Sequence, residues 1–334
     1  MKLIKSKYII NPTNHIMKKL LLSVSVLFFM FSCQNEEPGI QEAPTAAVVN
    51  ASARVCASNE VLKENLKNNP ELAGKMEQIE AYTSDAIANG RIVDGKIQIP
   101  VVFNVLYRTA AENVSLAQLQ SQIDVLNKDF NALNSDFNTT NNPYSSIKAN
   151  VEISFVLDQV IRKSTTKSSW GTNDAMKKTS TGGLAPTSPT TKLNYWVCTI
   201  GGGILGYAQF PGGSSSTDGV VCDGKYTGNT GTASFPFNLG RTATHEVGHW
   251  MNLRHIWGDA TCGSDLVSDT PTHDSPNGGV PAVGLRSTCS GTPLEMYMNY
   301  MDYTDDRGMY MFSNGQKSRM AAVFLVGGSR ASFR

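Results

Sequence analysis

Four short segments of the chain are rich in apolar, β-branched residues, and this pattern predicts β-strands. Residues 97–107 (IQIPVVFNVLY) alternate between apolar and polar positions, and residues 151–162 (VEISFVLDQVIR) form a second strand. Residues 193–200 predict a third strand and residues 219–224 a short fourth one. We expect these segments to pair in one sheet.

Three other segments repeat apolar residues at helical spacing. Residues 59–88 carry a loose apolar stripe that Pro70 interrupts. Ser115 can cap a helix that runs to about Leu133, and a further helix is expected from about 239 to 251. Strands and helices arranged around one sheet predict an α/β (α+β) layered domain over residues 96–334.

The N-terminal region has the pattern of an export signal. Two lysines precede an apolar run at residues 20–31, and Cys33 follows the run closely. This predicts a signal peptide over residues 1–33, with Met17 as the true start. A cysteine at this place resembles a bacterial lipoprotein signal, in which Cys33 would carry the lipid at the outer membrane. The alternative is an ordinary cleaved peptide and a secreted protein.

The charge of the chain is small. Charged residues make up 17% of the 334 residues and the formal net charge is +1, so no nucleic-acid partner is expected. We expect a monomer whose membrane contact, if any, is the lipid anchor. Five cysteines remain besides Cys33. Cys198 with Cys222, and Cys262 with Cys289, can form disulfides in an oxidising compartment, which leaves one cysteine over.

The segment HEVGHWMNLRH holds three of the five histidines. His245 and His249 are four residues apart, so a helix places both imidazoles on one face. Glu246 stands beside the first, where it can take a proton from a metal-bound water. Asn252 tolerates left-handed backbone, so it can end the helix and turn His255 toward the other two. Three nitrogen ligands and an open position are typical of catalytic zinc; the alternative is a helix with two surface histidines.

The same segment resembles the signature HExxHxxGxxH of the metzincin proteases, with Asn252 where those proteins have Gly. Residues 297–303 (YMNYMDY) are similar to their methionine turn. Met301 would then lie beneath the metal, and Tyr303 would bind it or stabilise the transition-state oxyanion. Within the metzincins, most of residues 96–327 resembles the pappalysin family. The shared motifs are GGGILGYAQFPGG, TDGVV, SDLVSDTP, NYMDYTDD and MFSNGQKSRM.

This resemblance implies a metzincin catalytic domain. Its parts would be a twisted mixed sheet, an active-site helix with a backing helix, and a C-terminal subdomain with the methionine turn. The resemblance also implies structural Ca²⁺, with Asp265, Thr270 and the Val267 carbonyl as oxygen ligands. A loop without metal is the alternative. The disulfide Cys262–Cys289 would staple this loop.

Arg54-Val55-Cys56 resembles the upstream Arg-x-Cys of pappalysin zymogens, whose thiolate plugs the zinc. A thiolate is a good fourth zinc ligand and displaces the catalytic water. We therefore expect residues 34–95 to be a propeptide and tether, with Cys56 as a zinc ligand of the latent form and cleavage near Arg91. The alternative is an unpaired or intermolecularly paired cysteine in the tether.

Residues and resemblance together predict a secreted or surface-anchored zinc metalloendopeptidase that acts on proteins or peptides. Glu246 would be its general base and Tyr303 its oxyanion-stabilising group. Members of the family favour Arg just after the cut bond, through an acidic group behind the methionine turn. Here the run is Asp305, Asp306 and Arg307, and Arg307 would neutralise the pocket or point to solvent. A zinc-stabilised adhesin with weak catalysis and a non-proteolytic zinc hydrolase are the alternatives.

Overall fold

The computed structural model describes residues 53–90, 96–139 and 141–334. The predicted signal peptide with Cys33, most of the tether and Arg91 lie outside the described residues. Within the described ranges, no helix has both the length and the apolar character needed to cross a membrane.

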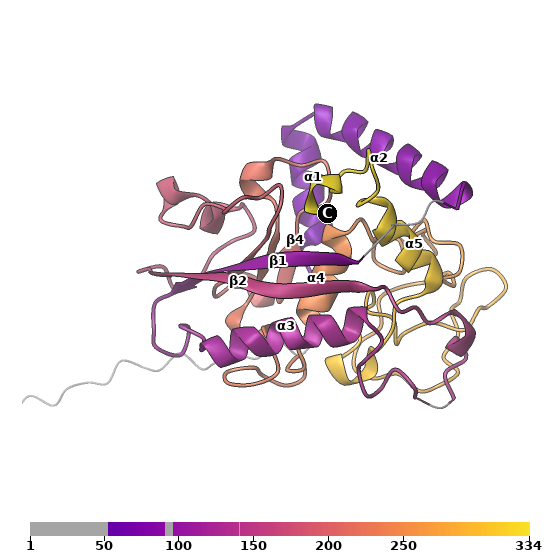
Figure 1. Ribbon diagram of the computed structural model, residues 1–334. Coiled ribbons are helices and arrows are strands. Elements are labelled where there is room, and N and C mark those ends of the chain that lie inside the picture. Colours follow the sequence, from indigo (N-terminus) through magenta and orange to yellow (C-terminus); the bar gives the residue numbers. More distant parts are fainter. Residues whose placement is uncertain (1–52, 91–95, 140) are drawn as a thin grey trace, which may run out of the picture. The chain divides into compact units, whose positions relative to one another are not determined.

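A five-stranded mixed sheet with the order β2-β1-β3-β5-β4 is the frame of the fold (Figure 1). The first four strands in this order are parallel, and the edge strand β4 is antiparallel to β5. This sheet confirms the predicted fold class. The strands are β1 (Ile97–Tyr107), β2 (Ile153–Ser164), β3 (Leu193–Val197), β4 (Gly206–Ala208) and β5 (Val220–Cys222).

Helices α3 and α4 cover one face of the sheet, as the predicted backing and active-site helices should (Figure 1). Phe103 of β1 belongs to the same buried cluster as Leu126 of α3 and Val247 of α4. This arrangement follows from the apolar stripe of each helix, which leaves water when it packs on the sheet. The helices are α1 (Ser58–Asn68), α2 (Glu71–Ala88), α3 (Leu116–Phe130), α4 (Arg241–Trp250) and α5 (Asn314–Ala322).

The other face of the sheet is covered by α1 and by the segment after β2. Val61 of α1, Trp170 and Met176 are buried against Trp196 of β3. Residues 163–190 are rich in Ser, Thr, Lys and Gly, a composition that predicts an exposed loop, but Trp170 and Met176 in the middle of this segment are buried. Its two large apolar side chains supply the cover that this face needs.

Two element boundaries differ from the predicted ones for backbone reasons. Strand β2 begins after Glu152, whose φ of 65° is incompatible with a strand. Helix α4 begins after Gly240, whose φ of 80° is a left-handed value that glycine adopts without steric cost. Both changes shorten a predicted element at its N-terminal end.

The predicted disulfide between Cys198 and Cys222 is wrong, because both are buried free thiols. Cys222 lies in register with Val197 on the neighbouring parallel strand. Side chains alternate across a sheet, so Cys198, one residue further on, points to the opposite face. The two thiols accordingly belong to different buried clusters.

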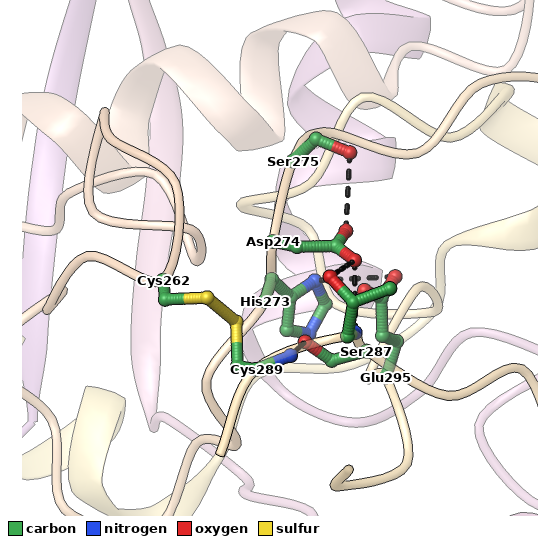
Figure 2. The surroundings of a disulfide bond; sticks show 8 residues. Cys262, His273, Asp274, Ser275, Ser287, Cys289 and Glu295 are labelled. Carbon is green, nitrogen blue, oxygen red and sulfur yellow. Dashed lines mark hydrogen bonds and ion pairs between the residues drawn. A yellow bond between two sulfur atoms is a disulfide. The ribbon is translucent and has the colours of Figure 1, made fainter.

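After α4 the chain folds mainly as loops until α5, and this C-terminal part has its own small core around Trp257, Met298 and Tyr310. Cys262 and Cys289 form a disulfide within it. Figure 2 shows this disulfide beside His273 and Glu295. The bridge ties together two loops that have few regular backbone hydrogen bonds of their own.

Candidate active site

Helix α4 and the turn after it bring the three histidines together. His249 Nε2 lies 3.2 Å from His245 Nε2 and 3.1 Å from His255 Nε2. The helix ends where Asn252 adopts a φ of 74°, and the Leu253 amide donates to a carbonyl of the last turn. The predicted reversal at Asn252 therefore occurs and redirects the chain toward His255.

All three imidazoles are buried, and their chemistry fits a metal. Burial lowers the pKa of His249 to about 3 and that of His245 well below its usual value. The His245 and His249 rings are therefore neutral, as metal ligation requires. Together with the Cys56 thiol, the three imidazoles form the one group of three or more His, Cys, Asp or Glu side chains placed to hold a metal ion in the described part of the chain. Imidazole nitrogen and thiol sulfur are donors that suit zinc.

Cys56 faces this cluster from the N-terminal segment. Its ligand atom and those of the three histidines all lie within 4.8 Å of one another. Burial first, and then the nearby Glu246 carboxylate, raise the pKa of the Cys56 thiol well above its usual value. A bound cation would instead lower the pKa of this thiol, because it favours the thiolate.

Glu246 is held by two groups of the same N-terminal segment. The Ser58 hydroxyl donates to Glu246 Oε2 at 2.9 Å, and Cys56 Sγ lies 3.3 Å from the same oxygen. Burial raises the pKa of Glu246 to about 7, against the opposing effect of these two hydrogen bonds. Ser58 was not predicted as a site residue, and only its position two residues after Cys56 pointed to it.

The segment around Cys56 runs along the edge strand β4. The Leu205 amide donates to the Val55 carbonyl at 2.9 Å, and the Ala57 amide donates to the Gly206 carbonyl at 3.1 Å. Cys56 thus forms a parallel bridge with Gly206. The segment fills the edge at which an extended peptide could pair with the sheet.

Arg54 enters a buried pocket beside the histidines. Its Nη2 lies 2.6 Å from Asp306 Oδ1, and both side chains are almost fully buried. Its guanidinium also donates to the Thr304 carbonyl and lies over the Phe237 ring. Of the three predicted specificity residues, Asp306 is the one that reaches this pocket. Asp305 is also buried, whereas the Arg307 side chain is 61% exposed.

Met301 and Tyr303, the residues of the predicted methionine turn, both lie next to the helix and loop that carry the histidines. Met301 is buried under α4, and a Cβ added at Gly248 would come within 2.5 Å of its sulfur. The Tyr303 ring packs edge-on against His255, and its hydroxyl donates to the Cys56 carbonyl at 3.0 Å. Burial raises the pKa of Tyr303, so the phenol keeps its proton.

The predicted calcium ligands also converge. The Thr270 hydroxyl lies 2.8 Å from Asp265 Oδ2 and 3.0 Å from the Val267 carbonyl oxygen. Burial raises the pKa of Asp265 to about 6. Asp269 points elsewhere, because it accepts hydrogen bonds from Ser313 and Gly315 at the start of α5.

Comparison with known proteins agrees with this site. Residues 198–325 match the family described as Pregnancy-associated plasma protein-A. Extracellular metalloprotease 1 of Coccidioides posadasii is 32% identical over 292 aligned residues, and the match covers 84% of this chain and 92% of that protein. An extracellular metalloprotease of Pyricularia oryzae is 34% identical over 251 aligned residues, and the match covers 72% of this chain and 80% of that protein.

Two solved structures are similar throughout the fold. Promirolysin of Tannerella forsythia, a mutant, superposes with a TM-score of 0.76 at 36% identity, covering 84% of this chain and 97% of that one. Mature mirolysin in complex with a cleaved peptide gives 0.69 at 39% identity, covering 72% and 96%. The predicted family and enzyme class are confirmed: the chain belongs to the pappalysin family, that of pregnancy-associated plasma protein-A, and is an extracellular-type zinc metalloendopeptidase.

Proposed function

We propose that the protein is made as a latent zymogen in which residues 34–95 block a zinc endopeptidase of residues 96–334. The observation that carries this proposal is the place of Cys56, whose sulfur completes a four-ligand cluster with His245, His249 and His255. A thiolate bound there would fill the position that a catalytic zinc ion must keep open. Removal of the N-terminal segment would reopen it.

The comparison structures give the proposed boundary independent support. Promirolysin covers 84% of this chain and mature mirolysin covers 72%, so the two differ by 12% of 334 residues, or about 40 residues. The described N-terminal helical part, residues 53–90, has a similar length. A cut near Arg91 would separate it from the catalytic domain.

The segment around Cys56, residues 54–58, is called the latent segment because it would hold the enzyme inactive. It contacts each group that the proposed reaction needs. Zinc held by the three histidines would act as a Lewis acid that polarises the scissile carbonyl and acidifies a water molecule. Glu246 would accept the proton of that water and pass it to the leaving amine. In the latent form its carboxylate is bound by Ser58 and lies beside Cys56. Both partners would leave with the propeptide.

Tyr303 would stabilise the negative charge that develops on the carbonyl oxygen of the substrate. Its hydroxyl now donates to the Cys56 carbonyl at 3.0 Å. That backbone carbonyl thus stands in for the carbonyl of a substrate peptide bond.

Arg54 supports a preference for a basic side chain next to the cut bond. Its guanidinium fills a pocket that ends at the Asp306 carboxylate, 2.6 Å away. An Arg side chain of a substrate could make the same charge-assisted hydrogen bond. Arg307 does not neutralise this pocket in the latent form, because its side chain is largely exposed. Cleavage profiling with a peptide library, compared between the activated enzyme and its Asp306→Asn variant, tests this preference.

Helix α2 supplies a second anchor for the proposed propeptide. Glu80 binds both terminal nitrogens of Arg319 on α5, at 2.7 and 2.5 Å. Arg319 also donates to the Asn252 carbonyl at the turn between the second and third histidines, so the contact reaches the metal site. Tyr82 adds a hydrogen bond to the Val326 carbonyl.

Two further parts of the proposal concern calcium and location. Asp265, Thr270 and the Val267 carbonyl would hold a structural Ca²⁺, since three hard oxygen donors converge there. The signal peptide ending at Cys33 would place the protein at the cell surface through a lipid, or else release it.

The central experiment measures bound zinc and casein cleavage by the activated protein, with and without a chelator. We expect about one zinc per chain and cleavage that the chelator abolishes. Glu246→Ala should retain zinc and lose cleavage by several orders of magnitude. Zinc without any cleavage by the unsubstituted enzyme would instead favour a binding module, and undiminished cleavage by Glu246→Ala would refute the role of this residue.

A further inference from the structure

The three candidate ligands differ in what holds their second ring nitrogen. His245 Nδ1 lies 2.7 Å from the Tyr300 carbonyl oxygen, and His249 Nδ1 lies 2.8 Å from the Leu253 carbonyl oxygen. His255 Nδ1 lies 2.5 Å from a carboxylate oxygen of Asp259. Carbonyl and carboxylate oxygens only accept, so each Nδ1 carries a hydrogen, and the neutral form of each ring then presents its lone pair at Nε2. Only the third histidine has a charged partner.

The backbone places Asp259 at this ring through a tight, left-handed turn. The Gly258 amide donates to the His255 carbonyl at 2.8 Å, and Gly258 and Asp259 have φ values of 65° and 58°. A Cβ at Gly258 would come within 2.4 Å of the Ser264 amide nitrogen, so the turn requires glycine there. Positive φ at a non-glycine residue is uncommon in proteins, and the residues that adopt it cluster at functional sites.

A neighbouring ring fixes the plane of the same imidazole. Trp257 stacks on His255 with ring centroids 4.3 Å apart and an interplanar angle of 7°. Stacking leaves the ring free to rotate within its own plane, whereas the hydrogen bond from Nδ1 does not. Trp257 and Asp259 together therefore fix the direction of His255 Nε2.

We propose that Asp259 is a positioning residue that selects the Nδ1–H tautomer of His255, aims its Nε2 at the metal and strengthens it as a zinc ligand. A carboxylate that accepts from a ligating histidine raises the basicity of that ligand. This role rests on the proposed assignment of the three histidines as zinc ligands. The effect is confined to one ligand, because the other two donate to uncharged carbonyls.

The Asp259 carboxylate has few other interactions within the described part of the chain. Among the described residues, its side chain forms a hydrogen bond with His255 alone, and it is 22% exposed. Lys63 of α1 attracts it only through charge. Replacing Asp259 should therefore affect the metal site more than the stability of the metal-free fold.

The test uses the full-length chain carrying Glu246→Ala, so that no variant can cleave itself. Asp259→Gly removes the carboxylate but permits the left-handed backbone, and Asp259→Asn keeps an acceptor but removes the charge. Zinc affinity is measured by competition with a chelator. We expect Asp259→Gly to weaken it about 10- to 100-fold and Asp259→Asn by a smaller factor. Asp158→Asn, which alters an exposed ion pair with Lys192, should stay within about twofold.

Two further readouts separate positioning from a structural role. The visible absorption bands of the cobalt-loaded protein should shift in Asp259→Asn, whereas the melting temperature of the metal-free protein should not. Zinc affinity of Asp259→Gly within about threefold of the parent would overturn the inference. His255→Ala tells the two assignments apart: if it weakens zinc binding and Asp259→Gly does not, only the role of Asp259 fails. If His255→Ala also has no effect, the ligand assignment itself fails.

Discussion

Replacement of Arg54 by alanine should strongly destabilise the docked state of the latent segment, although it changes only one side chain. The Arg54 guanidinium forms a 2.6 Å ion pair with Asp306, and both side chains are almost completely excluded from water. It also donates to Thr242 and to the Thr304 carbonyl. Alanine would remove all of these contacts from the segment that carries Cys56.

The free-energy cost of this substitution depends on the hydrogen bonds that Asp306 keeps once Arg54 is gone. Breaking a buried ion pair by removing one partner costs roughly 3–5 kcal/mol, because the other charge stays buried. Asp306 keeps hydrogen bonds from the amides of Leu239 and Arg241, which favours the lower end of that range. A loss of about 3 kcal/mol raises the fraction of detached segments by about 100-fold.

Alkylation of the Cys56 thiol measures this detachment directly, because the thiol is only 3% exposed when the segment is docked. In zinc-loaded, full-length protein carrying Glu246→Ala, Arg54→Ala should raise the alkylation rate about 100-fold. Val55→Ala is the matched control, since the Val55 side chain is 40% exposed and its backbone hydrogen bond is unaffected. An alkylation rate of Arg54→Ala similar to that of Val55→Ala would refute the reasoning.

Two other predictions follow from buried charges. Glu80→Gln should shorten the lag before the full-length protein becomes active, because the buried Arg319 loses its ionic partner. Glu77→Gln, on the same helix, should leave the lag unchanged; equal lags in the two variants would argue against the second anchor. Burial raises the pKa of Asp129 to about 6, against the attraction of Arg241. The folded state then binds more protons than the unfolded state between about pH 4 and pH 6, so Asp129 makes stability fall as pH rises through this window, by up to ~3 kcal/mol. Urea unfolding at several pH values should show that Asp129→Asn flattens this decline, and an unchanged slope would contradict the assignment.

Local patterns in the sequence were sufficient for the parts of the site that depend on short-range geometry. The spacing of His245 and His249 fixes their common face on any helix, and Asn252 marks the reversal that leads to His255. Strands β1 and β3 and helix α3 were predictable for the same reason, because their apolar periods are continuous.

Contacts between distant segments could not be derived in this way. Nothing near Glu80 in the sequence indicates that it binds Arg319, which is 239 residues away. Ser58 looks like an ordinary residue at the start of a helix until the fold places Glu246 beside it. The pairing of Cys198 with Cys222 was wrong because cysteine spacing carries no information about the face of a sheet.

The sequence by itself determined the type of chemistry, since ligand residues at fixed spacing on one helix require no knowledge of the remaining chain. The tertiary structure alone decided how that chemistry is held in check. Cys56, Arg54 and Ser58 come from one short segment, yet each meets a partner 188 to 252 residues further on. Such contacts depend on how sheet, helices and loops pack together, because packing brings into register residues that no local period connects.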